Sequence, residues 1–359
     1  MHIVFLTRKY PPQKGGMETF SYELIRHFSD EKTVIARGKR QADIIWVIPL
    51  LAIKAIGLRK KADAYHLGDL VLAPVARILK VFTPRPVVAT VHGLELTYKK
   101  MGPLYTWMIN ASLPSVDRFV CVSENTRSLL MERGVPEEKI KCIPHGVTPP
   151  QMRDRNEARS ALCRMMSTDD GCDNQFIILS VGRLVRRKGI EWFVRSVMPL
   201  LDNLSPLFVI ASDGPERESI ERAIEETKLQ QSVTLLGGID NELLTNLYSG
   251  ADAFVMPNID EKDDVEGFGF VAVEAAAAGL PVVASRLEGI TDAIYDGQNG
   301  RLVDAEQPEQ FAAVLREWAA DVEERRAFGQ RAREYTVSHF RWDDVAESYR
   351  SVFDSLLKY

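Results

Sequence analysis

The alternation of short β-branched runs with longer helical patterns constrains this chain more than any other feature. In the first half, the runs that predict strands lie at 2–7, 33–37, 64–67, 87–92, 118–122 and 141–143. In the second half they lie at 176–181, 207–211, 233–235, 253–256, 281–284 and 301–303. Strands that alternate with helices are typical of parallel βαβ units. The two similar sets therefore predict an α/β protein with two doubly wound parallel sheets.

The length of the chain agrees with two domains, since 359 residues is roughly twice a common domain size. The polar stretch 149–174, which begins with a pair of prolines, is predicted to be the linker. We expect one domain at 1–165, a second at 166–340 and a terminal helix at 341–359. Apolar residues recur at helical spacing in this last segment, so the helix is expected to pack on another part of the protein.

Composition excludes several classes of protein. With 45% hydrophobic and 26% charged residues, the chain is predicted to be globular rather than disordered. Its four cysteines show no CxxC spacing, which argues against a disulfide scaffold or a zinc ribbon and fits a reducing cytoplasm. The longest apolar run, 44–58, is interrupted by Pro49 and Lys54 and is too short to cross a membrane.

Charge is distributed unevenly along the chain. The net charge is −5, yet residues 1–165 contain 26 Lys and Arg against 15 Asp and Glu. This excess favours an anionic acceptor or an anionic membrane surface as a partner, although chance segregation of surface charge gives the same pattern. No motif typical of nucleic-acid binding accompanies the basic residues, so no nucleic-acid partner is expected.

The apolar run 44–58 allows two interpretations. It is followed by Arg59, Lys60 and Lys61. A buried crossover helix, closed by cations that complement its dipole, is the preferred interpretation. The alternative is a domain edge that rests on the inner leaflet of a membrane, where basic residues attract anionic lipids.

Two glycine-containing turns after predicted strands are candidate phosphate sites. Gly15 and Gly16 precede the first predicted helix, where free N–H groups attract phosphate, although a plain turn explains them equally well. In the second half, Arg183 and Lys188 lie with two further arginines between glycines. Such a cluster predicts a bound diphosphate, with a solvated basic loop as the alternative.

A glycine-rich loop also precedes the most apolar predicted helix of the second half. Gly267, Phe268 and Gly269 separate Glu266 from this helix, and Glu274 lies within it among apolar residues. The helix N-terminus can donate to phosphate, and both carboxylates can accept hydrogen bonds from ligand hydroxyls.

Two histidines close predicted strands. His92 ends the strand at 87–92, at the edge where open α/β sheets bind ligands, so it is a candidate to contact substrate. His145 lies just before the predicted linker, and a conformational role is expected for it.

Together these motifs resemble the retaining glycosyltransferases of family 4 (glycosyl transferases group 1), which have the GT-B fold of two Rossmann-like domains facing a central cleft. Glu266 and Glu274 look like the EX7E motif of that family. The other matching motifs are Gly15-Gly16-Met17-Glu18, Val91-His92-Gly93, Val122-Ser123-Glu124, Ile143-Pro144-His145-Gly146-Val147, Val181-Gly182-Arg183 with Lys188-Gly189, Asp213-Gly214-Pro215 and Asp296-Gly297-Gln298-Asn299-Gly300. Asp292 departs from the family, which often has Glu there.

The resemblance implies a role for each candidate residue. It implies that Arg183 and Lys188 hold the leaving diphosphate and that Glu274 binds the ribose hydroxyls. Glu266 and His92 are implied to contact the donor sugar. The remaining residues of the implied donor site are Gly15, Gly16, Gly214, Gly237, Gly267, Phe268 and Gly269, with Gly16 at the phosphates and the backbone near Gly237 at the base.

The implied activity is transfer of a hexose, with retention, from a UDP- or GDP-linked sugar to a lipid-linked or polysaccharide-precursor acceptor. Neither a metal nor a cofactor is expected, because no DxD pair ends a predicted strand and the cations of Arg183 and Lys188 replace magnesium. The resemblance also implies that the helix at 341–359 crosses back to the first domain. A cytoplasmic location is expected, with attachment to the inner membrane face left open. A nucleotide-sugar epimerase of the same fold and a non-catalytic nucleotide-sugar-binding protein are the alternatives.

Overall fold

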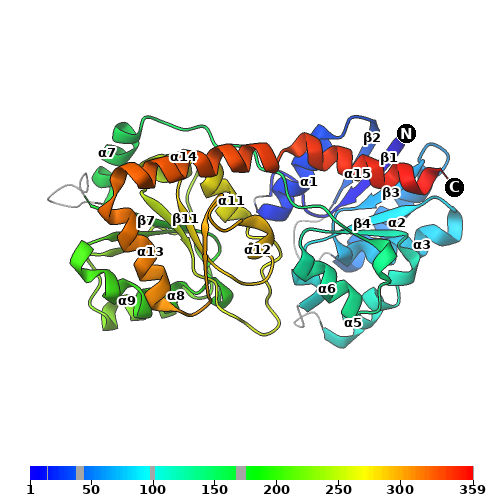
Figure 1. Cartoon of the computed structure of the whole chain (residues 1–359). Coiled ribbons are helices and arrows are strands. Elements are labelled where there is room, and N and C mark those ends of the chain that lie inside the picture. Colours follow the sequence, from blue (N-terminus) through cyan, green and yellow to red (C-terminus); the bar gives the residue numbers. More distant parts are fainter. Residues whose placement is uncertain (14, 38–43, 98–101, 167–174, 359) are drawn as a thin grey trace. The chain divides into compact units, whose positions relative to one another are not determined.

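The computed structural model describes residues 1–13, 15–37, 44–97, 102–166 and 175–358 (Figure 1). Their contacts divide the chain into two compact units. The first unit comprises Met1–Gly146, Asp263–Phe268 and Phe340–Tyr359. The second comprises Val147–Lys262 and Gly269–His339. Each unit thus includes segments that are distant in sequence.

The first unit is built on a parallel sheet with the strand order β2-β1-β3-β4-β5-β6. The strands are β1 (His2–Thr7), β2 (Glu31–Ala36), β3 (Ala64–Leu67), β4 (Val87–Val91), β5 (Arg118–Cys121) and β6 (Ile140–Cys142). The helices are α1 (Gly16–His27), α2 (Ile44–Gly57), α3 (Ala73–Phe82), α4 (Leu94–Thr97), α5 (Gly102–Asn110), α6 (Glu124–Glu132) and α15 (Trp342–Leu357). Short 3-10 helices lie at Leu70–Leu72, Leu113–Ser115 and Glu137–Lys139.

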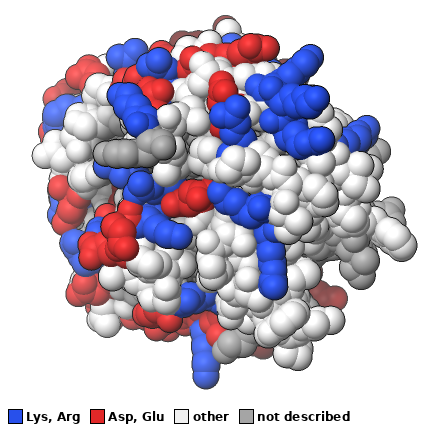
Figure 2. All heavy atoms as spheres, turned by 90° about the vertical axis from the view of Figure 1, so that its right-hand side faces the viewer, with Lys and Arg blue, Asp and Glu red and all other residues white. Residues whose placement is uncertain are grey.

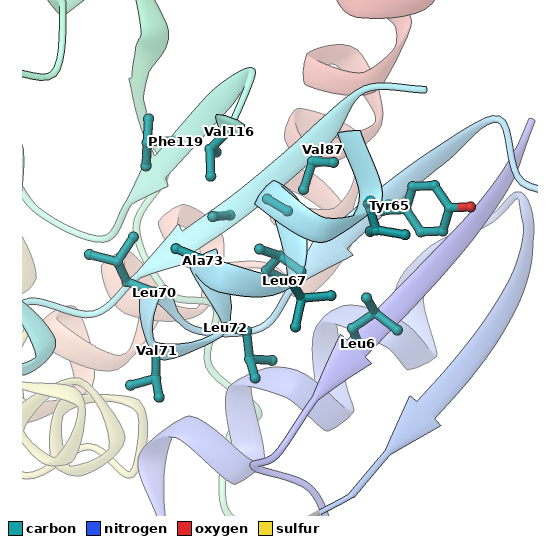
Figure 3. Close-up of a cluster of buried hydrophobic side chains, with 14 of the residues drawn as sticks. Leu6, Tyr65, Leu67, Leu70, Val71, Leu72, Ala73, Val87, Val116 and Phe119 are labelled. Carbon is teal, nitrogen blue, oxygen red and sulfur yellow. The ribbon is translucent and has the colours of Figure 1, made fainter. Parts of the chain in front are cut away.

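Apolar side chains cover both faces of this sheet. On one face, Leu6, Leu67 and Leu70 belong to one buried cluster (Figure 3). On the other face, Phe28 contacts the ring of Phe353, with centroids 5.9 Å apart, so that α15 packs against α1. The terminal apolar stripe predicted from the sequence therefore belongs to the core of the first unit.

The second unit repeats the architecture with the strand order β12-β11-β10-β7-β8-β9. The strands are β7 (Ile177–Val181), β8 (Leu207–Ala211), β9 (Val233–Leu235), β10 (Ala253–Met256), β11 (Val282–Ser285) and β12 (Arg301–Val303). The helices are α7 (Arg155–Met166), α8 (Ile190–Ser196), α9 (Arg217–Glu226), α10 (Asn241–Gly250), α11 (Phe270–Ala277), α12 (Ile290–Ala293), α13 (Pro308–Ala320) and α14 (Val322–His339). The 3-10 helices η6 (Arg186–Lys188) and η7 (Met198–Leu204) complete it.

The predicted strands and the doubly wound α/β fold are confirmed, but the linker prediction for 149–174 was wrong in part. Helix α7 occupies Arg155–Met166 and packs against α10, with Ala158 and Leu162 buried. Residues 167–174 lie outside the described part of the chain. Cys163 is disulfide-bonded, which the cysteine spacing did not predict.

The preferred interpretation of 44–58 as a buried helix was also wrong for one side of α2. Val47, Leu51 and Ala55 are buried, as expected of a crossover helix. Trp46 and Ile53, however, are 78% and 67% exposed. Helix α2 is therefore apolar on a buried side and on a solvent-facing side.

One buried carboxylate ties several elements of the second unit together. Asp252, only 4% exposed, lies directly before β10. Its oxygens lie 2.6 Å from Arg155, 2.8 Å from Arg159 and 2.7 Å from Arg325. Its Oδ2 also accepts a hydrogen bond of 2.9 Å from the backbone N–H of Ile177. These contacts join α7, α14, β7 and β10, which explains why the polar segment 155–166 is helical and packed.

We expect Asp252→Asn to lower the free energy of unfolding by about 3–5 kcal/mol, because it leaves buried guanidinium groups without their counter-charge. Urea unfolding followed by circular dichroism measures this change. The matched control is Glu242→Gln, since Glu242 forms an exposed ion pair with Arg153 that is expected to contribute at most about 1 kcal/mol. Equal stability of Asp252→Asn and the wild type would show that the ion pairs of Asp252 do not stabilise the second unit.

Candidate functional site

His92 lies directly after β4 and is buried, with 7% exposure. Its Nε2 is 3.1 Å from the carbonyl oxygen of Gly68. Since a carbonyl can only accept, Nε2 carries the proton and donates, which leaves Nδ1 as an acceptor. Nδ1 has no hydrogen-bond partner among the described residues. The ring can thus accept a hydrogen bond from a substrate hydroxyl.

The segment 263–268 lies against the turn that contains His92. A Cβ placed on Gly267 would be 1.9 Å from the carbonyl oxygen of His92, so no side chain fits there. Gly93 has φ +100, and a Cβ placed on it would lie 3.2 Å from the Cα of Gly267, which is also a close approach. This backbone contact brings Glu266 and His92, both predicted from the sequence to meet the sugar, into one unit.

Phe268 and His145 stack beside this contact. Their ring centroids are 5.0 Å apart with an interplanar angle of 29°. Burial lowers the pKa of His145 well below its usual value, and the charge of Glu266 opposes that shift. His145 is therefore neutral at physiological pH, in agreement with a conformational role.

In the second unit, the basic loop follows β7 and includes η6. Gly189, with φ +64, has no room for a side chain because a Cβ would be 1.9 Å from the carbonyl oxygen of Pro257. The side chain of Lys188 turns back toward Gly182, since its Cε would lie 3.7 Å from a Cβ there. Arg183 is exposed. The two cations predicted to hold a diphosphate therefore flank one turn.

The two other arginines of this loop already have interaction partners. The Nε of Arg186 lies 2.7 Å from Glu261 Oε2, so this guanidinium is already ion-paired within the unit. Arg187 is half-buried and also has an interaction partner. Lys188 also has an interaction partner. The prediction that Arg183 and Lys188 bind phosphate therefore rests on the sequence motif and on their place at one turn.

Gly214 and Gly237 follow β8 and β9. A Cβ on Gly214 would lie 2.3 Å from the carbonyl oxygen of Leu184, so this glycine lets two strand-end turns pack closely. Gly237 has φ +72, which favours glycine. The turns after β7, β8 and β9, which are neighbours in the sheet, thus form one edge of the second unit.

Glu274 lies on α11, which begins after Gly269 in a left-handed conformation with φ +85. The hydroxyl of Tyr248, on α10, donates to Glu274 Oε2 at 3.4 Å. Burial raises the pKa of Glu274 to about 7, and the hydrogen bond from Tyr248 opposes this rise. The carboxylate is thus poised to change its charge near neutral pH.

Comparison with known proteins decides the family. The family model described as Glycosyl transferases group 1 matches residues 171–335, and the model described as Glycosyltransferase Family 4 matches residues 31–150. The chain belongs to the group 1 glycosyltransferases of family 4.

Relatives cover nearly the whole glycosyltransferase. An uncharacterized glycosyltransferase of Methanocaldococcus jannaschii is 28% identical over 82% of this chain and 75% of that protein. A GDP-mannose-dependent alpha-(1-6)-phosphatidylinositol monomannoside mannosyltransferase of Mycolicibacterium smegmatis is 26% identical over 95% of both chains.

Solved structures confirm the GT-B fold. The sucrose-phosphate synthase of Thermosynechococcus elongatus has a TM-score of 0.78 at 21% identity and covers 99% of both chains. Anabaena HepE in complex with UDP and glucose has a TM-score of 0.74 at 17% identity, covering 98% of this chain and 99% of its own.

The predicted site residues of this glycosyltransferase are divided between its two units. The first unit holds Gly15, Gly16, His92, Glu266, Gly267 and Phe268. The second holds Arg183, Lys188, Gly214, Gly237, Gly269 and Glu274. Among the described residues, no group of three or more His, Cys, Asp or Glu side chains is arranged to hold a metal ion.

Sequence reasoning missed Tyr248, the partner of Glu274. It lies 26 positions before Glu274 in a helix of ordinary amphipathic pattern, so no motif marks it. Sequence reasoning also missed the polar side chains Glu95, Thr97 and Tyr105 of the first unit, which line a cavity.

We expect the affinity of the glycosyltransferase for a nucleoside diphosphate to rise by up to about tenfold between pH 6 and pH 8. The reason is that the carboxylate of Glu274, which the family resemblance implies to bind the ribose, is the stronger acceptor when ionised, and its pKa of about 7 lies within this interval. Calorimetric titration with UDP and GDP at several pH values measures the effect. Glu274→Gln is the control, because it keeps the titration of the phosphate and removes that of the carboxylate. An identical pH dependence in both proteins would exclude Glu274 as the cause.

Proposed function

We propose that this glycosyltransferase is a retaining enzyme that transfers a hexose from a UDP- or GDP-linked sugar to a lipid-linked or polysaccharide-precursor acceptor. The observation that supports the proposal is the close approach of Gly267 to the carbonyl oxygen of His92, because Glu266, the neighbour of Gly267, then lies near the end of β4. A nucleotide-binding protein without catalysis would not need the two groups that the family resemblance assigns to the sugar to lie so close together.

The proposed chemistry follows from where charge develops. The bond between the anomeric carbon and the diphosphate breaks, and the leaving oxygen becomes negative. Arg183 and Lys188 stabilise this charge without a metal ion. The acceptor oxygen bonds to the anomeric carbon on the same face, and its proton passes to the departing phosphate. Glu274 holds the ribose, and His92 Nδ1 accepts from a sugar hydroxyl.

The names of the relatives guide the choice of substrates. The mycobacterial relatives are mannosyltransferases that depend on GDP-mannose and act on a phosphatidylinositol mannoside. Other relatives are D-inositol 3-phosphate glycosyltransferases. GDP-mannose is therefore the first donor to test, beside UDP-glucose and UDP-N-acetylglucosamine. A ligand at 100 times its Kd adds about 2.7 kcal/mol of stability, which a thermal-shift screen of nucleoside diphosphates detects.

We expect Arg183→Ala and Lys188→Ala each to reduce kcat about 10²-fold, the usual effect of removing one preorganised charge donor. Transfer is measured with the donor selected by the thermal-shift screen, and nuclear magnetic resonance of the product reports the anomeric configuration. Arg222→Ala, an exposed arginine on α9, is the control and should retain full activity. EDTA should leave the rate unchanged.

Three results would contradict this proposal. An inverted product would exclude retention, and loss of activity in EDTA with recovery in magnesium would exclude a metal-independent mechanism. Full activity of both Arg183→Ala and Lys188→Ala would exclude the proposed phosphate grip.

The surface of the first unit supports attachment to an anionic membrane. Trp46, Leu50 and Ile53 lie at helical spacing along α2 and are 78%, 41% and 67% exposed. Exposed basic residues follow at 59–61. Figure 2 shows wide uncharged areas bordered by Lys and Arg, and also by Asp and Glu, on the face that it draws. No helix in the described ranges is long and apolar enough to cross a membrane. Apolar insertion with basic flanks is the chemistry of a peripheral membrane surface.

We expect the protein to sediment with vesicles of phosphatidylglycerol and phosphatidylcholine, and less with phosphatidylcholine alone or at high salt. The double variant Trp46→Ser with Ile53→Ser should bind at least about tenfold more weakly, since burial of each side chain contributes roughly 1.5–3 kcal/mol. Tyr295→Ser, which removes a 46% exposed ring from the second unit, is the control. Binding that is absent from both vesicle types, or unchanged in the double variant, would exclude this surface.

A further inference from the structure

A cavity of about 320 Å³ opens in the first unit, apart from the predicted donor residues. Helices α4, α5 and α6 form its walls, and Asp263 contributes from the segment packed on this unit. The cavity adjoins the His92 turn, since Glu95 Oε1 accepts a hydrogen bond of 3.3 Å from the backbone N–H of His92. Its volume is at the lower end of the range typical of ligand pockets, which suits a single small ring.

The polar lining of this cavity lacks partners. Glu95 Oε2, Thr97 Oγ1 and Tyr105 OH are buried and have no hydrogen-bond partner among the described residues. Buried polar atoms of this kind are costly unless something bonds to them. They comprise one carboxylate acceptor and two hydroxyls, each of which can donate and accept. Leu96, Ile109 and Leu129 supply an apolar wall beside them. A ring with both hydroxyl groups and C–H faces matches this lining.

The charge of the lining excludes some ligands. Glu95, Glu132 and Asp263 bring carboxylates to the wall, and Arg133 brings a guanidinium. The guanidinium of Arg133 already donates hydrogen bonds to Asn110 Oδ1, at 2.9 Å, and to the carbonyl oxygen of Leu96. Burial raises the pKa of Tyr105; the charges of Asp69 and Glu95 act in the same direction, and those of Arg8 and Arg133 oppose them. The lining itself carries three carboxylates against one guanidinium, and this excess of negative charge disfavours phosphate and carboxylate groups.

We propose that this cavity binds an uncharged polyol ring of the acceptor, a sugar or cyclitol, through Glu95, Thr97 and Tyr105, and rejects a ring that carries phosphate. The proposal rests on the proposed glycosyl transfer. The phosphate of a lipid-linked acceptor then lies outside the cavity, where the basic residues of the first unit can meet it.

Ligand-observed nuclear magnetic resonance with the full chain tests this proposal. The probes are methyl α-mannoside, methyl α-glucoside and myo-inositol, each beside its monophosphate, in the presence of the nucleoside diphosphate selected by thermal shift. We expect at least one neutral probe to bind, and its phosphate to bind about tenfold or more weakly. Thr97→Val and Tyr105→Phe should each weaken binding of the neutral probe about tenfold, the loss expected for one hydrogen bond of about 1.4 kcal/mol.

Controls separate this inference from the proposed function. Both variants should bind the nucleoside diphosphate as the wild type does, and an unchanged circular dichroism spectrum and unfolding midpoint show that their first unit folds. Thr97→Val keeps the test open if Tyr105→Phe is unstable. Glu95→Gln should bring the affinities for neutral and phosphorylated probes closer together. Tyr22→Phe, which alters a 39% exposed tyrosine of α1, should change nothing.

The following outcomes would overturn the inference: tighter binding of a phosphorylated probe, no binding of any neutral probe, or unchanged binding in Thr97→Val and Tyr105→Phe. Failure of the proposed function has a different result, namely no nucleoside diphosphate binding and no consumption of a nucleotide sugar.

Discussion

The close approach of Gly267 to the carbonyl oxygen of His92 is the contact on which the candidate site depends. A Cβ at position 267 would lie only 1.9 Å from that oxygen, so any residue other than glycine would push the segment 263–268 away from β4. The contact fixes Glu266 beside His92, and Phe268 then stacks on His145. Four residues from different parts of the chain thus lie close together because two backbone segments meet: His92, His145, Glu266 and Phe268.

The same contact explains why the two glutamates of the EX7E motif belong to different units. Glu266 is held with the first unit through Gly267, whereas Glu274 lies on α11 of the second unit. Gly269, in a left-handed conformation, lets the chain turn between them. A motif that is continuous in sequence therefore supplies one carboxylate to each unit, and their environments differ. Burial raises the pKa of Glu274 to about 7. The charge of Glu266, in contrast, opposes the lowering of the pKa of His145 by burial.

Much of the fold was predictable because its strands are buried on both faces. A parallel strand such as β4, with every residue buried, is a continuous apolar run, and helical patterns separate such runs. Helix α7 was missed because its stability comes from Arg155 and Arg159 on Asp252, a partner almost a hundred positions away. The exposed side of α2 was missed because Trp46 and Ile53 are as apolar as core residues, so the hydrophobic pattern does not distinguish them. Within the site, sequence motifs indicated His92 and Glu274. The positions of Tyr248 and Tyr105 depend on tertiary packing, which residue spacing does not reveal.

Two kinds of charge occur in the first unit: basic residues on its surface and carboxylates in the cavity beside His92. The excess of Lys and Arg in residues 1–165 suggested an anionic partner, yet the cavity beside His92 is lined by carboxylates. Both observations are compatible if the anionic part of an acceptor contacts the basic surface and its uncharged ring enters the cavity. Exposed cations act over about a Debye length and attract a membrane or a phosphate from solvent. The carboxylate of Glu95, whose Oε2 is buried, acts at contact distance and accepts hydrogen bonds from hydroxyl groups. An acceptor with a neutral ring and an anionic anchor satisfies both, whereas a free anionic ring satisfies only the first.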